Sequence, residues 1–206
     1  MGTDGYRRGA RLVFALFAAF SIAVGLGWLY GPDLWALRTS QSSPSGFLDR
    51  ISMASSFFGG VEVTTVALGA LLVWLFFTRR RGLSVRLLAV FVGTGILELL
   101  LKLYLPQVPL PEGSGRSPDF APVVAIDYPY PYPSGHMLRG VILFGALYLL
   151  SGNPLVRGGI LAVLLALALS RVYLGVHWAS DIVGGALLGI AGLLWAFGRK
   201  GVRPWR

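Results

Sequence analysis

The run Val85–Leu105, VRLLAVFVGTGILELLLKLYL, decides the fold class of this chain. A helix needs roughly 20 mostly apolar residues to cross a bilayer, and this run reaches that length with its charges near the two ends. Five further runs have the same apolar character: Leu12–Tyr30, Val61–Thr78, His136–Leu150, Ile160–Val176 and Trp178–Phe197. We therefore expect an all-α protein in which residues 1–206 form a single domain, a bundle of six transmembrane helices.

The composition favours a membrane protein and excludes some chemistry. Of 206 residues, 55% are hydrophobic and 13% are charged, and the mean hydropathy is +0.68. Soluble domains carry about a quarter charged residues. The chain has no cysteine, which excludes disulfides and thiol chemistry. No small-residue cleavage site follows Leu12–Tyr30, so we interpret this run as a retained span rather than a signal peptide.

The Lys and Arg residues predict the orientation of the bundle. With the N-terminus in the cytoplasm, twelve of them lie inside: Arg7, Arg8, Arg11, Arg79, Arg80, Arg81, Arg86, Arg157, Arg199, Lys200, Arg203 and Arg206. Six lie in the outer half: Arg38, Arg50, Lys102, Arg116, Arg139 and Arg171. This asymmetry follows the positive-inside rule and predicts that both termini are cytoplasmic. The net charge of +9 is then a topology signal and an attraction for anionic lipids, with no soluble module to bind nucleic acid.

Two long outer loops connect the spans. The first, Gly31–Gly60, contains FLDRISMASSFF, whose apolar residues recur at near-helical spacing and predict an interfacial helix. The second, Pro106–Tyr132, is rich in Pro and Gly and should be irregular. It ends in three tyrosines that alternate with prolines: Tyr128, Tyr130 and Tyr132. They fit either an interfacial aromatic belt or the entrance for a lipid head group.

The ionisable residues within the spans all fall near the predicted outer ends: Glu62, Glu98, Lys102, His136, Arg139, Arg171, His177 and Asp181. Charges in a span are costly and usually mark function or a buried pair. The only two histidines of the chain belong to this group. Such clustering at one membrane depth favours a functional site over a transporter or channel, whose charges would spread through the membrane.

His177 and Asp181 are four residues apart at the start of the last span, which places them on one helix face. The aspartate can accept a proton from one imidazole nitrogen and leave the other free as a nucleophile. A plain helix-start carboxylate favoured by the helix dipole is the alternative.

Pro133-Ser134-Gly135-His136 opens the fourth span, with Ser134 as a suitable N-cap. A helix N-terminus of this kind binds phosphate oxygens, although a simple capping turn has the same sequence. Lys102 and Arg171 lie near the outer ends of two other spans, where each fits phosphate binding or snorkelling to the interface.

Together these residues resemble the type 2 phosphatidic acid phosphatase (PAP2) superfamily of membrane phosphatases. Its pattern is K-x6-R-P, then P-S-G-H, then S-R-x5-H-x3-D. The second part is present at residues 133–136, and the third is complete as Ser170-Arg171-VYLGV-His177-WAS-Asp181. The first part differs from the family pattern, because Pro109 or Leu110 stands where the arginine is expected after Lys102. Arg139 or Arg116 can supply the missing charge, and we favour Arg139, one turn after His136.

The resemblance implies a metal-independent lipid phosphatase without a cofactor. His177 would attack phosphorus and form a phosphohistidine, Asp181 would orient it, and His136 would protonate the leaving oxygen. The implied phosphate ligands are Lys102, Ser134, Gly135, Arg171 and Arg139. The substrate would be phosphatidate, phosphatidylglycerol phosphate or undecaprenyl pyrophosphate, met at the extracytoplasmic face of a bacterial plasma or inner membrane. The missing arginine keeps a second hypothesis open, a non-catalytic lipid-binding relative.

Overall fold

The computed structural model describes residues 3–116 and 128–198, and in these ranges the chain is entirely helical apart from turns and loops. Arg199, Lys200, Arg203 and Arg206, which the sequence places at a cytoplasmic C-terminus, lie outside the described residues. The described helices are α1 (Thr3–Gly25), α2 (Tyr30–Ser40), α3 (Gly46–Phe58), α4 (Val61–Phe77), α5 (Arg81–Tyr104), α6 (Gly135–Leu150), α7 (Pro154–Tyr173) and α8 (Ala179–Phe197). The expected all-α class is confirmed.

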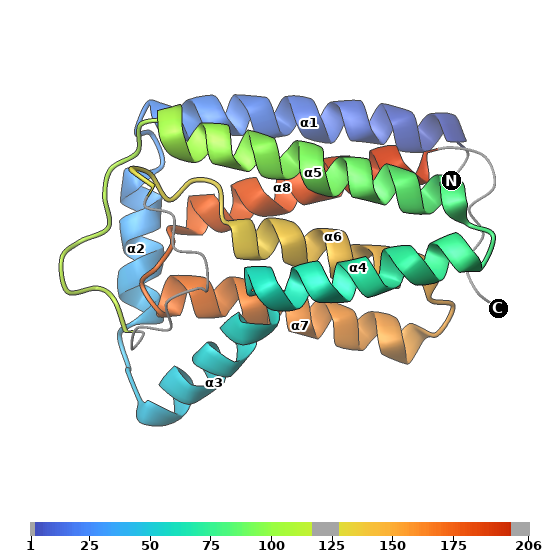
Figure 1. The fold of residues 1–206 in the computed structure, drawn as a ribbon. Helices are drawn as coiled ribbons and strands as arrows, with labels where there is room; N and C mark the ends of the chain where they lie inside the picture. The colour runs from blue at the N-terminus through green and yellow to red at the C-terminus, as the bar shows by residue number, and fades with distance from the viewer. Residues whose placement is uncertain (1–2, 117–127, 199–206) are drawn as a thin grey trace.

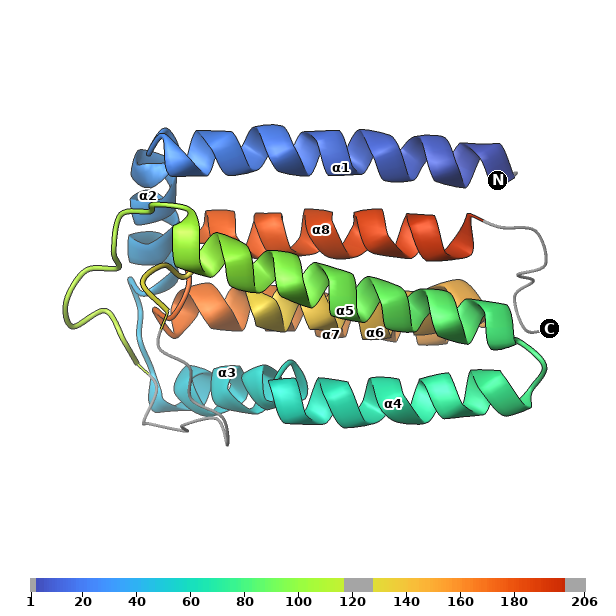
Figure 2. The same ribbon diagram turned by 45° about the horizontal axis from the view of Figure 1, so that its top comes forward.

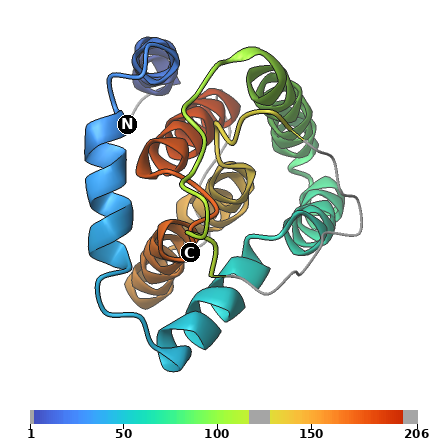
Figure 3. The same cartoon turned by 90° about the vertical axis from the view of Figure 1, so that its left-hand side faces the viewer.

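The helices that run roughly side by side along one axis are α1, α4, α5, α6, α7 and α8, whereas α2 lies across one end of the bundle (Figures 1 and 2). Figure 3, which looks onto that end, shows α6 and α8 near the centre with the other helices around them. The closest partners of α8 are α1 and α6, and α3 packs on α7. The loop that follows α5 crosses the same end, so α2, α3 and this loop together cover one end of the bundle.

Four helices are long and apolar enough to cross a membrane: α1, α5, α7 and α8. The pair α3 and α4, bent by 41° at a short break, would provide a fifth span, and α6 is a shorter apolar helix. Each of the six apolar runs in the sequence overlaps one of the six aligned helices. The count of six spans and the cytoplasmic position of both termini remain predictions.

The segment between the first two apolar runs is more helical than expected. The predicted first span, Leu12–Tyr30, is wrong at its end, because α1 stops at Gly25 and Tyr30 begins α2. Gly27 has φ +73°, a left-handed conformation that glycine adopts readily, and it turns the chain across the bundle end. The helix expected in FLDRISMASSFF is present as α3, and Ser45 caps it by accepting the Leu48 N–H at 3.2 Å.

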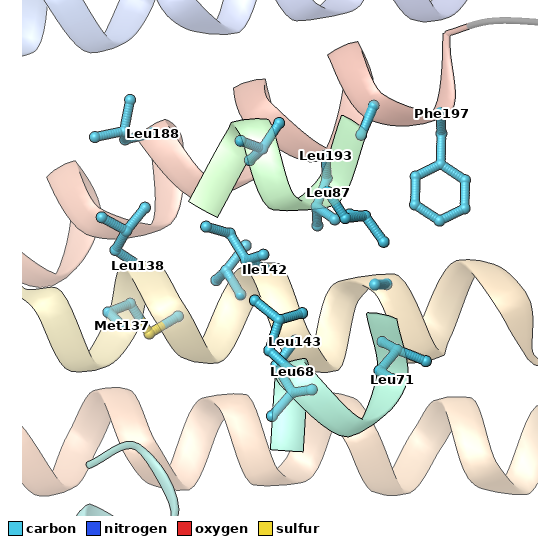
Figure 4. Packing of buried hydrophobic residues seen from close by; sticks show 14 of the residues in the cluster. Leu68, Leu71, Leu87, Met137, Leu138, Ile142, Leu143, Leu188, Leu193 and Phe197 are labelled. Carbon is cyan, nitrogen blue, oxygen red and sulfur yellow. The ribbon is translucent and has the colours of Figure 1, made fainter. Parts of the chain in front are cut away.

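The buried core is centred on α6 and α8. Figure 4 shows Leu138 of α6 beside Leu188 of α8, and Ile142 of α6 between Leu193 of α8 and Leu68 of α4. Both Leu138 and Ile142 are almost fully buried. Apolar association alone is weak in a bilayer, since lipid tails are as apolar as leucine, so tight packing must hold the helices together. Small residues allow this: a Cβ at Gly189 of α8 would lie 2.8 Å from Val141 Cγ1 of α6.

Tyr132 belongs to this core, which contradicts both sequence-based interpretations of its role. It is 0% exposed, its hydroxyl lies 2.8 Å from Ser21 Oγ of α1, and its ring stacks on Phe17 at 6.4 Å between centroids. A Cβ at Gly184 of α8 would overlap this ring. Tyr132 therefore fills the space between α1 and α8 instead of forming part of a belt or an entrance.

Candidate active site

His177 lies in the turn between α7 and α8, and Asp181 in the first turn of α8. His177 Nδ1 is 3.0 Å from Asp181 Oδ2, which also accepts the Trp178 N–H at 2.9 Å. Asp181 thus caps α8 while it binds the imidazole, so the helix start fixes the carboxylate. The turn depends on Gly175, at φ +65°, because a Cβ there would overlap the Ser114 carbonyl. The contact with Asp181 occupies Nδ1 of the His177 ring and does not involve Nε2.

The loop after α5 completes the environment of Asp181. Gln107 Nε2 donates to Asp181 Oδ1 at 2.8 Å, and the Trp178 indole N–H donates to the Val108 carbonyl at 2.9 Å. Asp181 is 0% exposed and receives three hydrogen bonds if His177 Nδ1 carries the proton. Sequence reasoning missed Gln107, because nothing in its spacing marks an amide within a Pro-rich loop as a partner of α8.

The start of α6 lies beside this pair. The Ser134 N–H donates to the Asp181 carbonyl at 2.9 Å, which joins the α6 start to α8. Ser134 occupies the N-cap position, but its side chain makes no capping hydrogen bond. Its buried Oγ has no hydrogen-bond partner among the described residues. The first-turn amides of α6 and this hydroxyl are therefore positioned to bind an oxyanion.

Two cations meet a carboxylate at the same place. Glu98 Oε1 is 3.0 Å from Lys102 Nζ, and Glu98 Oε2 is 2.9 Å from Arg139 Nη1. Lys102 also lies under the Tyr128 ring, 4.6 Å from its centroid. A Cβ at Gly135 would overlap Glu98 Oε1, so the absence of a side chain at this position allows Glu98 to approach the α6 start. The sequence had grouped Glu98 with the other site residues without giving it a role.

Arg171 and His136 complete the cluster. Arg171 Nη1 donates to Ser56 Oγ of α3, while its buried Nε has no hydrogen-bond partner in the part of the chain that the structure describes. His136 lies next to the break between α3 and α4, where a Cβ at Gly59 would be 3.3 Å from His136 Cδ2. Ser56 was missed by sequence reasoning, since only the packing of α3 on α7 brings it to Arg171.

The structure thus brings the eight expected site residues to one end of the bundle. Three cations lie near enough to both imidazoles for a charge interaction: Lys102, Arg139 and Arg171. Glu62, which the sequence grouped with them, is exposed in the first turn of α4. Within the described ranges, no group of three or more His, Cys, Asp or Glu residues could hold a metal ion.

Arg116 is held away from this cluster by an acidic partner. Its Nε and Nη2 donate to the two carboxylate oxygens of Asp49 at 3.0 and 3.1 Å, and its guanidinium lies 5.4 Å from the Tyr173 ring centroid. The hydrogen bond to Asp49 raises the pKa of Arg116. Arg116 therefore ties its loop to α3 and α7. Of the two candidates for the missing arginine, only Arg139 shares a carboxylate, Glu98, with Lys102.

Asp33 of α2 binds the first turn of α8, next to Asp181. Its carboxylate accepts the Ser180 N–H at 2.8 Å and the Ser180 hydroxyl at 2.6 Å, which fixes α2 against the first turn of α8. Burial raises the pKa of Asp33, and the two hydrogen bonds from Ser180 oppose that rise. The sequence gave no signal for this contact, because the two residues are 147 positions apart.

Comparisons with known proteins identify the family of this chain. The family model of the PAP2 superfamily matches residues 83–203. The chain is 32% identical over 127 residues to phosphatidylglycerophosphatase B of Bacillus subtilis (strain 168), covering 56% of this chain and 57% of that protein. It is 36% identical over 136 residues to the putative undecaprenyl-diphosphatase YbjG of Escherichia coli (strain K12), covering 64% and 65%. The matches thus span about three fifths of the length of these curated relatives.

A solved structure shares the fold over nearly the whole chain. The crystal structure of a transmembrane PAP2-type phosphatidylglycerolphosphate phosphatase from Bacillus subtilis superposes with a TM-score of 0.71. The superposition covers 92% of this chain and 94% of that one, at 22% sequence identity.

Proposed function

This chain belongs to the PAP2 superfamily, and on that premise we propose that it is a membrane lipid phosphatase that works through a phosphohistidine. The observation that carries the proposal is the His177–Asp181 pair, with Nδ1 and Oδ2 3.0 Å apart, beside three cations and the start of α6. An imidazole whose Nδ1 is held by a carboxylate, and which lies beside several cations, is suited to attack phosphorus through its Nε2 atom.

In the first step, His177 Nε2 attacks phosphorus and the bond from phosphorus to the leaving oxygen breaks. Asp181 holds the Nδ1–H and stabilises the positive charge that the imidazole gains. His136, on the first turn of α6, gives a proton to the leaving oxygen. In the second step, His136 takes a proton from water, the water oxygen attacks phosphorus, and the P–N bond breaks to release phosphate.

The phosphoryl oxygens need positive charge throughout both steps. Lys102, Arg139 and Arg171 supply it, together with the first-turn amides of α6 and the Ser134 hydroxyl. Arg139 takes the place of the arginine that is missing after Lys102. Because these groups carry the charge that a metal ion would otherwise provide, the proposed reaction needs no metal.

The site would lie at lipid head-group depth on the extracytoplasmic side. The opposite end of the bundle carries Arg79 and Arg80 between α4 and α5, Arg81 at the start of α5 and Arg157 in the first turn of α7. The positive-inside rule assigns that end to the cytoplasm. A site at this depth suits a lipid with a terminal phosphate or pyrophosphate. Phosphatidate, phosphatidylglycerol phosphate and undecaprenyl pyrophosphate are the classes we propose.

Phosphate release from these three lipids in detergent, with EDTA present, tests the proposal. We expect the wild-type protein and the exposed-loop control Glu112→Gln to release phosphate, and His177→Ala to release none. Equal release by wild type and His177→Ala would show that His177 is not the nucleophile.

A non-catalytic lipid-phosphate binder is the second candidate, favoured by Pro109 in the place of the usual arginine. It would bind phosphatidate in the same assay mixture without releasing phosphate from any lipid of the panel. Binding measured by calorimetry alongside turnover distinguishes the two functions.

A further inference from the structure

Glu98 is a buried carboxylate to which the proposed mechanism gives no task. It lies on α5 one turn before Lys102 and is 6% exposed. A buried charge costs several kcal/mol of lost hydration, so its retention among site residues calls for a role. Both of its oxygens are ion-paired, to Lys102 at 3.0 Å and to Arg139 at 2.9 Å.

The surroundings of Glu98 are those of a bound oxyanion. Besides the two cations, its carboxylate lies against the first residue of α6, since a Cβ at Gly135 would overlap Oε1. It is also close enough to His177 to act on that ring electrostatically. Lys102, Arg139 and the α6 start are the same groups proposed to bind the phosphoryl oxygens. Two anions cannot share these ligands without strong repulsion.

We propose that Glu98 is an internal competitor of the phosphate group, so that only an anion strong enough to displace its carboxylate from Lys102 and Arg139 enters the site. This inference rests on the proposed function, because it concerns the same phosphate ligands. It makes Glu98 the residue that separates terminal phosphates from phosphodiesters.

The charges of the two lipid classes explain the separation. A terminal phosphate carries a charge of about −1.5 to −2 near neutral pH, whereas a phosphodiester carries about −1. The cost of displacing Glu98 is the same for both, but the dianion gains roughly twice as much from Lys102, Arg139 and Arg171. For the dianion, the gain therefore exceeds the cost of displacing Glu98, and this cost is the threshold for entering the site. For the monoanion, the gain stays below this threshold.

The threshold matters because of where the site lies. A head-group site in a phospholipid membrane is surrounded by phosphodiester lipids at far higher concentration than any terminal lipid phosphate. If diesters bound Lys102 and Arg139 freely, they would block the site. Glu98 keeps these cations occupied until a terminal phosphate arrives.

Calorimetry in detergent tests the proposal with two short-chain probes, phosphatidate and phosphatidylglycerol. Every protein in this experiment carries His177→Ala, so that phosphatidate is bound but not hydrolysed, and wild type here means a protein with no other change. We expect wild type and the control Glu112→Gln to bind phosphatidate much more tightly than phosphatidylglycerol. We expect Glu98→Gln, which removes the charge and keeps the shape, to bind phosphatidylglycerol at least about tenfold more tightly than wild type. If Glu98→Gln binds the diester no more tightly than wild type, or wild type binds both probes equally, Glu98 is no competitor. Failure of wild type to bind phosphatidate would instead overturn the proposed function.

A second variant covers the case in which Glu98→Gln folds poorly, as judged from its unfolding temperature. Glu98→Ala leaves a space of carboxylate size, and added acetate can occupy it. We expect acetate to weaken the binding of phosphatidylglycerol to Glu98→Ala. An increase in diester affinity on adding acetate would show that Glu98 holds Lys102 and Arg139 in position, and would overturn the competitor role.

Discussion

Asp181→Asn is the substitution that tests the proposed nucleophile most sharply. The asparagine oxygen can still accept from His177 Nδ1 and the Trp178 N–H. Its amide nitrogen can face Gln107, whose Oε1 has no hydrogen-bond partner among the described residues. The variant should therefore keep the fold and the tautomer of His177. What it removes is the negative charge, at a position 0% exposed to solvent.

The size of the effect follows from that charge. A hydrogen bond to a charged group or a preorganised charge in a buried site contributes about 2 to 4 kcal/mol to a transition state. Since each 1.36 kcal/mol is a factor of ten, kcat should fall about 30- to 900-fold. KM should change little, because Asp181 binds the imidazole rather than the phosphoryl group.

The assay is phosphate release from a lipid phosphate in detergent, over a range of substrate concentrations, with Glu112→Gln as the charge-matched control. The unfolding temperature of each variant separates loss of chemistry from loss of fold. A folded Asp181→Asn protein with kcat within about threefold of wild type would refute the reasoning, because the carboxylate would then contribute nothing to the attack by His177.

Three further predictions concern other parts of the molecule. Arg139→Ala should lower kcat/KM about 10- to 100-fold by removing a charged phosphate ligand. Arg116→Ala should leave kcat/KM near the wild-type value. A larger loss of kcat/KM in Arg116→Ala than in Arg139→Ala would assign the missing arginine to Arg116. Gly184→Ala should destabilise the fold by about 1 to 3 kcal/mol, because its Cβ overlaps the buried Tyr132 ring; an unchanged unfolding temperature in detergent would contradict the packing of α1, Tyr132 and α8. Burial raises the pKa of Asp33 above 3.8, so the folded state binds its proton more tightly and stability should fall as pH rises from 3.8 through that raised pKa. Unfolding temperatures across the acidic range should show this slope in wild type, and Asp33→Asn should lack its contribution.

Local sequence spacing predicted the part of the site that joins near neighbours in the chain. His177 and Asp181 do meet, although not on one helix face: His177 lies before the N-cap Trp178, and Asp181 in the first turn of α8 reaches back to it. Residues 133–136 lead into the start of a helix as expected. Apolar length located the helices that carry Lys102 and Arg171. All of these features depend on a few neighbouring residues, which is why one sequence sufficed for them.

The supporting contacts could not be predicted because they join distant segments. Gln107 and Asp181 are 74 residues apart, Ser56 and Arg171 are 115 apart, and Asp33 and Ser180 are 147 apart. Tyr132 was misinterpreted for the same reason. Its neighbours suggest an exposed Pro-rich loop, while its burial depends on Ser21 of α1 and Gly184 of α8.

The glycines of α8 have a consequence for how this chain can evolve. Gly184 faces Tyr132 and Gly189 faces Val141, so a methyl group at either position meets another side chain. The same helix carries Asp181 at its start, so any shift that relieves such a clash also moves the partner of His177. Substitutions on this face of α8 should therefore lower both the stability of the fold and the catalytic activity. Exposed positions such as Leu161 and Leu165 of α7 are free to drift among apolar residues.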